Sequence, residues 1–301
     1  MKYSLSIAGT TRIVEQHIIA AKKNGFNIRS IFCTKKKNVP RANIIIKKFK
    51  IKNLFHNLND FMCDAEKFNC SVLIAPKLDE NNLILNKAVQ KNIKIIVEKP
   101  VFLNPEDFDQ YLKFKNKIFV AYNRTYYKSI KFIKNQLINN KCHSVMVHCP
   151  EINKTDIIKN SCHSMSMIYK LFGKLIFLNK YKNFDHINLL FRSKTGTLIY
   201  FIFDLKNPKN FSIDFNFYKK NILIKPLEKL FFTNKLTKHK IKNENHYSPN
   251  TKMLLNEYNF FGKPGFNEQY KNFKKFINNK SASYIDILDA KLINQYLNFI
   301  Y

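Results

Sequence analysis

The sequence predicts an α/β protein with an N-terminal doubly wound parallel sheet and a second α/β domain built on a largely antiparallel open sheet. Three observations support this. Strand-like and helix-like segments alternate through the first hundred residues, which is typical of a parallel sheet with helical crossovers. A glycine turn joins the first strand to the first helix. Short alternating strands, separated by Asn, Lys, Gly or Pro turns, follow one another between residues 144 and 224.

The composition is that of a globular chain. Its 301 residues are 45% hydrophobic and 14% aromatic, enough for two domains with their own cores. No stretch approaches the roughly 20 apolar residues of a membrane-spanning helix, and the N-terminus runs directly into a strand pattern without a signal-peptide core. We therefore expect a cytoplasmic protein.

The six cysteines contain no C-x-x-C pair and no histidine partners at zinc-ligand spacing. We expect reduced, mostly buried thiols and no metal site. The formal net charge of +31 raises nucleic acid as a partner, but the lysines are spread along the whole chain. We therefore do not expect nucleic-acid binding as the main function, although the charge favours anionic small ligands.

Residues 3–8 read as the first strand, and Gly9 opens the turn into a helix that covers 18–23 and stops at Asn24-Gly25. This is the context of a dinucleotide-binding fingerprint. Only Gly9 of its three glycines is present, with Thr11 and Val14 in the other two places. Either binding is weaker than usual or the loop has shifted.

A second strand at 27–33 ends in Thr34 and three lysines, Lys35 to Lys37. An NAD-specific site places an Asp or Glu near this point to bind the ribose 2′-hydroxyl, and none is present. A hydroxyl followed by ammonium groups suits a 2′-phosphate, so NADP is favoured over NAD. The alternative is a solvated lysine run.

Helices are predicted at 42–49, from 59 and at 81–92, with a strand at 71–76. The next strand, Ile93 to Val97, ends in Glu98-Lys99-Pro100. A buried parallel strand of this kind delivers its last side chains to the sheet edge where α/β proteins bind ligands. The proline makes a cis bond after Lys99 a structural candidate.

A further strand at 117–121 leads to Asn123 and Arg124, which can hydrogen-bond sugar hydroxyls or a phosphate at the same edge. We place the domain boundary here, with a dinucleotide-binding domain at 1–121 and a substrate and oligomerisation domain at 122–301. In the second domain, residues 230–249 are polar and read as a loop. Amphipathic helices are predicted at 266–278 and 285–301, the last being a candidate to pack back on the first domain.

The chain resembles the Gfo/Idh/MocA family of NAD(P)-dependent oxidoreductases in the order of five blocks. These are Gly9 to His17, Val97 to Pro100, Tyr122 to Arg124, Cys162-His163 with Met167 to Gly173, and Lys263 to Phe266 with Gln269. The resemblance implies a Rossmann domain followed by a second α/β domain. It also implies hydride transfer between nicotinamide and a hydroxyl-bearing carbon of a sugar, nucleotide sugar or related polyol.

The resemblance further implies site residues. Lys99 and His163 are the expected catalytic residues, with His163 as acid/base on the reacting hydroxyl. Substrate contacts are expected from Lys99, Asn123 and Arg124, and a homo-oligomer is expected through the second-domain sheet. The expected cofactor contacts are Gly9, Thr11, Arg12, Ile13, Thr34, Lys35, Pro76 and Glu98.

The sequence departs from the family near His163. Many relatives carry an Asp three residues after the histidine or shortly before it, where this chain has Ser166, Lys159 and Asn160. Asp156 is the candidate substitute from a neighbouring turn. The departures favour, as an alternative function, a catalytically degenerate relative that binds a ligand or a partner.

Overall fold

The computed structural model describes residues 3–33, 35–242, 244–258 and 262–301. The chain forms two compact units, the first made of residues 1–123 and 260–294 and the second of residues 124–259 and 295–301. The expected domains, 1–121 and 122–301, were contiguous segments. The contacts instead assign most of the C-terminal segment to the first unit.

The first unit is built on a six-stranded sheet, in which every neighbouring pair is parallel. The strand order is β3-β2-β1-β4-β5-β6, so the order reverses at β1, as in doubly wound sheets. The predicted parallel sheet is confirmed. The strands are β1 (Tyr3–Ala8), β2 (Phe26–Phe32), β3 (Asn53–Phe55), β4 (Ser71–Ile74), β5 (Ile95–Glu98) and β6 (Ile118–Ala121).

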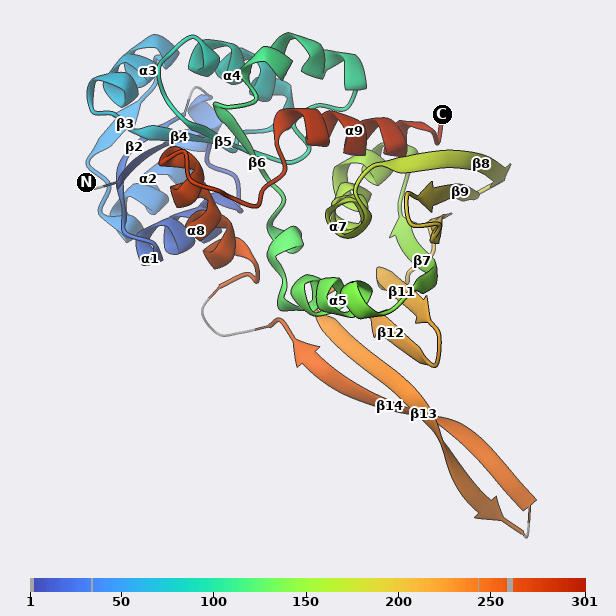
Figure 1. Ribbon diagram of the computed structural model, residues 1–301. Coiled ribbons are helices and arrows are strands. Elements are labelled where there is room, and N and C mark those ends of the chain that lie inside the picture. Colours follow the sequence, from blue (N-terminus) through green and yellow to red (C-terminus); the bar gives the residue numbers. More distant parts are fainter. Residues whose placement is uncertain (1–2, 34, 243, 259–261) are drawn as a thin grey trace. The chain divides into compact units, whose positions relative to one another are not determined.

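Helices connect these strands and bury their apolar sides against the sheet (Figure 1). They are α1 (Val14–Lys23), α2 (Val39–Phe49), α3 (Leu58–Lys67) and α4 (Asn81–Val89), with 3₁₀ segments at Lys36–Asn38, Leu78–Glu80, Pro105–Phe114 and Asn123–Tyr126. The predicted stop of α1 is confirmed, because Gly25 follows it with φ +83°. The Asn57 side chain caps α3 by accepting from the backbone N–H groups of Asn59 and Asp60.

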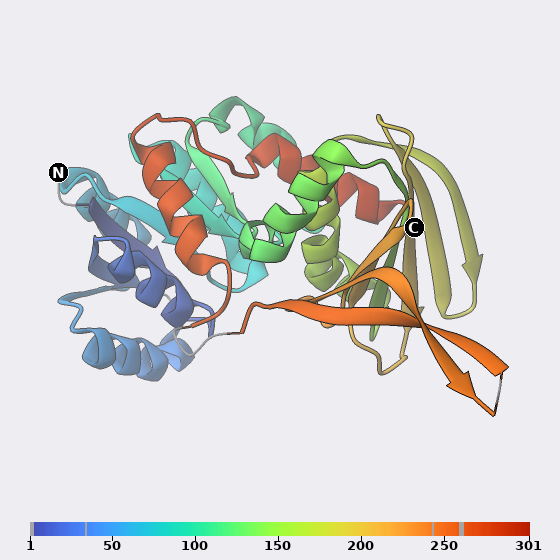
Figure 2. The same cartoon turned by 60° about the horizontal axis from the view of Figure 1, so that its bottom comes forward.

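The C-terminal segment adds a helix to this unit. Helix α8 (Phe266–Ile277) packs beside α1 (Figure 2). It buries Tyr270 and Phe273 against Phe26, while Phe119 contacts Phe273 and Phe276. Helix α9 (Ile287–Asn298) begins in the first unit and ends in the second.

The second unit is built on an eight-stranded sheet with the order β14-β13-β12-β11-β7-β10-β9-β8. Only the β7–β10 pair is parallel, so the expected, largely antiparallel sheet is confirmed. The first six strands are β7 (Cys142–Glu151), β8 (Leu175–Asn183), β9 (His186–Ser193), β10 (Leu198–Leu205), β11 (Ser212–Phe217) and β12 (Lys220–Ile224).

One face of this sheet is covered by helices α5 (Lys128–Asn139) and α7 (Cys162–Phe172), as Figure 1 shows. A short helix, α6 (Lys154–Asp156), and a π-helical turn at Ile157–Ser161 lead directly into α7. On the buried face, Val145 of β7 lies beside Ile199 of β10, and Val147 lies beside Phe201. Alternate side chains of the same strands point to the opposite face.

The prediction of a loop at 230–249 is wrong. The segment belongs to a long hairpin of β13 (Lys229–Ile241) and β14 (Glu244–Asn256). Strand β13 pairs with β12 only from Leu230 to Thr233. Beyond that point β13 and β14 pair only with each other as a ribbon whose side chains are mostly exposed.

None of the helices in the described ranges is both long enough and apolar enough to cross a lipid bilayer.

Candidate functional site

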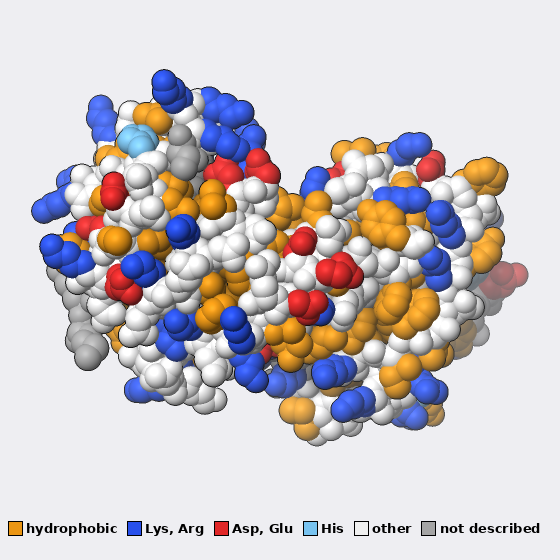
Figure 3. Space-filling model, turned by 90° about the horizontal axis from the view of Figure 1, so that it is seen from above, with side chains coloured by type: hydrophobic (Ala, Val, Ile, Leu, Met, Phe, Trp, Pro, Cys, Tyr) orange, Lys and Arg blue, Asp and Glu red, His pale blue; other side chains and the backbone are white. Residues whose placement is uncertain are grey.

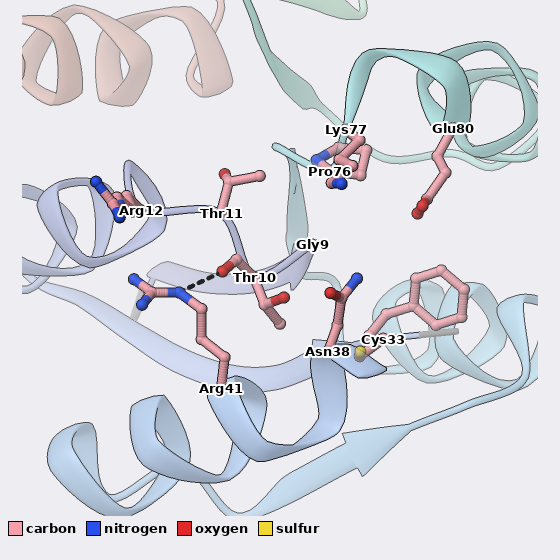
Figure 4. Close-up of a pocket in the computed structure, with 11 residues that line it drawn as sticks. Gly9, Thr10, Thr11, Arg12, Cys33, Asn38, Arg41, Pro76, Lys77 and Glu80 are labelled. Carbon is pink, nitrogen blue, oxygen red and sulfur yellow. Dashed lines mark hydrogen bonds between the residues drawn. The ribbon is translucent and has the colours of Figure 1, made fainter. Parts of the chain in front are cut away.

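A pocket of about 280 Å³ opens in the first unit at the carboxyl ends of β1, β2 and β4 (Figure 4). This is the edge at which α/β sheets bind their ligands. Three chain segments build it: the loop between β1 and α1, the segment after β2 with the start of α2, and the segment after β4. The residues that line it are Gly9, Thr10, Thr11, Arg12, Phe32, Cys33, Asn38, Arg41, Pro76, Lys77 and Glu80.

Gly9 brings the β1–α1 loop close to the end of β4. Its φ is +115°, and a Cβ at this position would overlap the Ala75 carbonyl and lie 2.6 Å from the Pro76 nitrogen. Only glycine fits both the conformation and the contact. The Gly9 N–H also donates to the Phe32 carbonyl at 3.0 Å, which joins the loop to β2.

The two non-glycine residues of the fingerprint are accommodated by the surrounding structure. The Thr11 hydroxyl donates to the Ala75 carbonyl at 2.8 Å, so its side chain ties the loop to β4 while it still lines the pocket. Val14 is fully buried in the first turn of α1. Within the described chain, no side chain caps the start of α1. The Val14 and Gln16 N–H groups donate to the Thr11 and Ile13 carbonyls at 3.0 Å. The positive end of the helix dipole, with the other N–H groups of this turn, suits an anion such as a pyrophosphate.

Arg41 of α2 reaches the pocket from the side opposite Pro76 and Lys77 (Figure 4). Its Nε donates to the Thr10 carbonyl at 2.7 Å, and its Nη2 lies 3.1 Å from Glu15 Oε1. The hydrogen bond from Lys48 to Glu15, supported by Arg41, lowers the pKa of the Glu15 carboxyl. Arg41 is therefore held in place as a cation beside the loop.

The predicted cofactor contacts differ in where they lie. Gly9, Thr11, Arg12 and Pro76 line the same pocket, and Ile13 immediately precedes α1. Thr34 lies outside the described residues.

Lys35 is part of an ion-pair cluster. Its ammonium lies 2.6 Å from Glu80 Oε1 and 3.2 Å from Asp79 Oδ2. The hydrogen bonds that the Lys35 ammonium donates, first to Glu80 and then to Asp79, raise the pKa of Lys35. Lys35 is not among the described residues that line the pocket, whereas Asn38 and Arg41 are.

Sequence reasoning missed Asn38, Arg41, Lys77 and Glu80. Asn38 immediately precedes α2 and Arg41 lies in its first turn, and no local pattern distinguishes either residue as a pocket residue. Lys77 and Glu80 follow β4 by a few residues. Cys33 also lines the pocket, and burial raises the pKa of its thiol. This disfavours a thiolate nucleophile at neutral pH.

Glu98 and Lys99 lie at the end of β5, also at the carboxyl edge. The Lys99–Pro100 bond is cis, as the sequence suggested. The Glu98 carboxylate is bound by His17 of α1, with 2.7 Å between Glu98 Oε1 and His17 Nε2. The Asn123 amide donates to the Pro264 carbonyl at 3.0 Å.

Arg124 and His163 belong to the second unit. Arg124 forms an ion pair with Glu228, at 3.3 Å. His163 lies in the first turn of α7, and its carbonyl accepts the hydroxyl of Ser166 at 2.7 Å. Asp156, the candidate partner for His163, lies 3.9 Å from Lys159. In the described ranges, no group of three or more His, Cys, Asp or Glu side chains could hold a metal ion.

Residues 4–123 match the family model described as "Oxidoreductase family, NAD-binding Rossmann fold", Gfo/Idh/MocA. The matched residues are similar to the NAD-binding domain of the Gfo/Idh/MocA family. In this part of the chain, the pocket with Gly9 and the start of α1 occupies the dinucleotide-binding position of a Rossmann fold. Among curated proteins, none matches the sequence.

Solved structures share the fold over the whole chain at low sequence identity. An oxidoreductase from Agrobacterium radiobacter, in complex with NAD+, L-tartaric acid and magnesium, is 14% identical with a TM-score of 0.75, over 99% of this chain and 95% of that one. UDP-N-acetylglucosamine 3-dehydrogenase GnnA from Acidithiobacillus ferrooxidans is 10% identical, with a TM-score of 0.73 over 98% and 95%. A super-repressor mutant of Gal80p from Saccharomyces cerevisiae is 11% identical, with a TM-score of 0.80 over 100% and 95%.

Proposed function

We propose that this protein is an NAD(P)-dependent oxidoreductase that moves a hydride between nicotinamide and a hydroxyl-bearing carbon of a sugar, nucleotide sugar or related polyol. The observation that carries the proposal is the pocket at the ends of β1, β2 and β4, in a domain that is similar to an NAD-binding oxidoreductase family. The Gly9 turn and the N–H groups at the start of α1 suit the pyrophosphate. The side toward α2 suits the adenosine ribose.

The cofactor we favour is NADP, with Arg41 as the residue that contacts its 2′-phosphate. A guanidinium binds phosphate oxygens through two N–H groups at once. Arg41 lines the pocket, and its bonds from Nε to the Thr10 carbonyl and from Nη2 to Glu15 leave Nη1, with two N–H groups, for a phosphate. Lys35 pairs with Asp79 and Glu80 and is not among the described lining residues. This reassigns to α2 the phosphate contact that the sequence suggested for Thr34 and Lys35. Glu80 also lines the pocket, and its negative charge would repel the 2′-phosphate.

Bound nicotinamide supplies the hydride acceptor or donor. From the chain, we propose that the Lys99 ammonium donates a hydrogen bond to the oxygen of the reacting hydroxyl. The His163 imidazole then takes the hydroxyl proton as hydride leaves the carbon, and returns it in the reverse direction. Asn123 and Arg124 are proposed to hold substrate hydroxyls while also keeping their contacts with Pro264 and Glu228.

A second candidate function is binding of a ligand or partner without turnover. It is favoured by the residues around His163, where Ser166 uses its hydroxyl on the helix backbone and Asp156 pairs with Lys159. A carboxylate at the position of Ser166, as many relatives have it, would orient the imidazole and strengthen it as a base more than a serine does. Steady hydride transfer to or from any polyol would exclude this candidate.

Nucleic acid is not proposed as the main partner. Figure 3 shows Lys and Arg side chains scattered over the face that it draws, with hydrophobic and uncharged surface between them. A nucleic-acid site normally gathers its cations into a stripe or patch.

The test is a fluorescence titration with NADPH and with NADH, on wild type and two variants. Arg41→Met should weaken NADPH binding about tenfold, the scale of one charge-assisted contact, and leave NADH binding within about twofold. Lys35→Met is the matched control and should leave both unchanged. Equal affinity of wild type for the two nucleotides would refute the 2′-phosphate assignment. Binding of neither by folded protein would refute the oxidoreductase proposal.

We also propose that two copies pair through the open face of the second sheet. Large apolar side chains lie exposed there, including Met146 of β7 and its neighbour Tyr200 of β10, with Ile176 and Leu178 of β8. A row of such side chains on a sheet face favours a covering partner, and relatives of the family usually pair in this way.

A further inference from the structure

A fully buried histidine links the first helix, the end of β5 and the C-terminal segment. His17 of α1 lies 2.7 Å from Glu98 Oε1 through Nε2 and 3.0 Å from the Tyr270 hydroxyl through Nδ1. Both His17 and Tyr270 have no exposed surface. All three residues belong to the first unit.

For the neutral imidazole of His17, the Glu98 carboxylate sets the direction of both hydrogen bonds, because a carboxylate only accepts. Burial, and then the charge of Glu98, raise the pKa of Tyr270 well above its usual value, so its hydroxyl keeps its proton. When this hydroxyl donates to Nδ1, the ring proton resides on Nε2 and faces a carboxylate oxygen. Each bond then has one donor and one acceptor. The other neutral tautomer would place the Nε2 lone pair against the Glu98 carboxylate.

Packing holds the imidazole in this orientation. The Phe266 ring meets it edge-on, with 4.9 Å between centroids and 87° between planes. The Tyr270 ring meets it at 5.7 Å and 77°. Both rings come from α8, so the C-terminal segment determines how a helix near the N-terminus presents its histidine.

The consequence appears at Glu98, the last residue of β5. One carboxylate oxygen is bound by His17, while the side chain keeps 16% of its surface exposed at the carboxyl edge of the sheet. A carboxylate held on one side and accessible on the other is suited to accept a hydrogen bond from a neutral donor, such as a ribose hydroxyl.

We propose that His17 and Tyr270 are positioning residues for the cofactor: they orient the Glu98 carboxylate so that it accepts a hydrogen bond from a hydroxyl of the bound nicotinamide nucleotide. The inference rests on the proposed function, in which Glu98 contacts the cofactor. It adds two residues that do not touch the nucleotide, one of them from the C-terminal segment.

The experiment compares His17→Leu, which removes the donor, with His17→Gln, whose amide can still donate to Glu98. Dissociation constants for NADPH and NADH and the unfolding temperature are measured for both. His17→Leu should weaken both nucleotides about tenfold, and His17→Gln should stay within about threefold of wild type. Phe276→Leu, on α8 but away from His17, is the control: it should lower the unfolding temperature and leave both affinities unchanged.

Tyr270→Phe covers the case in which His17→Leu fails to fold, because it removes only the hydroxyl. It should also weaken both nucleotides, by about threefold or more. Wild-type affinity in His17→Leu or in Tyr270→Phe would overturn the proposal. An equal loss of nucleotide affinity in His17→Leu and His17→Gln would also overturn it. Only His17→Gln keeps a donor for Glu98, so an equal loss would mean that packing, not the hydrogen bond, matters.

A second measurement separates this inference from the proposed function. Nitrogen NMR of the cofactor-free protein reports the tautomer of His17, assigned by the signal that is missing in His17→Gln. The hydrogen on Nε2 is the expected result in wild type and in Tyr270→Phe, because the Glu98 carboxylate accepts it in both, and a hydrogen on Nδ1 would overturn the hydrogen-bond chain. If the protein binds neither nucleotide yet shows the Nε2 tautomer, the proposed function fails and the positioning of Glu98 stands.

Discussion

At the scale of single residues, the β1–α1 loop depends on one glycine. Gly9 combines φ +115° with a contact to the Ala75 carbonyl that leaves no room for a Cβ. The strain of the backbone and the clash with backbone atoms add, because neither can be relieved by rotating a side chain. The loop would have to move away from β4, taking Thr11 with it.

We therefore expect Gly9→Ala to lower the free energy of unfolding by roughly 2–5 kcal/mol and to weaken nucleotide binding. Denaturant unfolding and the NADPH titration measure the two effects. Gly25→Ala is the matched control, because Gly25 also has positive φ, +83°, but nothing lies within 4 Å of an added Cβ. Its cost should be only about 1 kcal/mol, without a change in binding. Equal effects of the two variants would contradict this account of Gly9.

Local sequence could predict Gly9, Thr11, Arg12 and Pro76 as neighbours, because each follows a strand that ends at the same sheet edge. It could not predict Arg41. That residue lies in a helix, and nothing in a helical pattern tells which side chain reaches a loop of another element. Lys35 looked equally suited to a phosphate, and its pairing with Asp79 and Glu80 depends on the loop after β4.

At the scale of elements, the long hairpin shows why some strands cannot be predicted from the alternation of apolar and polar residues. Alternation of apolar and polar residues arises when one face of a strand is buried. From Leu236 to Ile241 and from Glu244 to Pro249 most side chains of the ribbon are exposed on both faces. The sequence there is mostly polar for this physical reason, with Leu236, Ile241 and Tyr247 as exposed exceptions, and it reads as a loop.

Helix α9 offers a test of capping and burial together. The Asp286 carboxylate accepts the Asp289 N–H at 2.8 Å, as an N-cap. Burial nevertheless raises the pKa of Asp286. A carboxyl whose pKa is higher in the folded state binds its proton more tightly there. Its ionised form therefore reduces stability at neutral pH, and this penalty disappears as the pH falls through the folded-state pKa.

Asp286→Asn keeps an oxygen for the cap and removes the charge. We expect it to stabilise the protein at neutral pH by at most about 1 kcal/mol, with the difference vanishing near pH 4. Asp286→Ala also removes the cap and should instead destabilise by about 1 kcal/mol. Unfolding curves across this pH range test both. A gain for Asp286→Asn that persists at acid pH would refute the role of ionisation.

At the scale of the whole molecule, the sequence predicted both sheets and a last helix that packs back on the first domain, but not that residues 260–294 as a whole join the first unit. The pattern of strands and helices is local, whereas assigning residues 260–294 to the first unit depends on contacts between segments far apart in sequence. Aromatic side chains of α8 meet Phe26 and Phe119 across more than a hundred residues of intervening chain. No local pattern records such a pairing.

The assembly is tested by substituting a charge into the exposed face of the second sheet. Wild type should have the mass of a dimer in light scattering, and Tyr200→Glu should shift it to a monomer because it buries a carboxylate in the interface. Tyr218→Glu is the control, since Tyr218 is exposed in the turn between β11 and β12. A monomeric wild type would refute the pairing.

The return of the chain to its first unit also has a consequence for synthesis. A ribosome makes the six parallel strands early, but it makes α8 only after residues 124–259 of the second unit have been translated. Until then Phe26 and Phe119 lack their α8 partners, and His17 lacks its hydrogen bond with Tyr270. We expect the nascent N-terminal segment to remain incompletely folded and to engage chaperones until α8 has emerged.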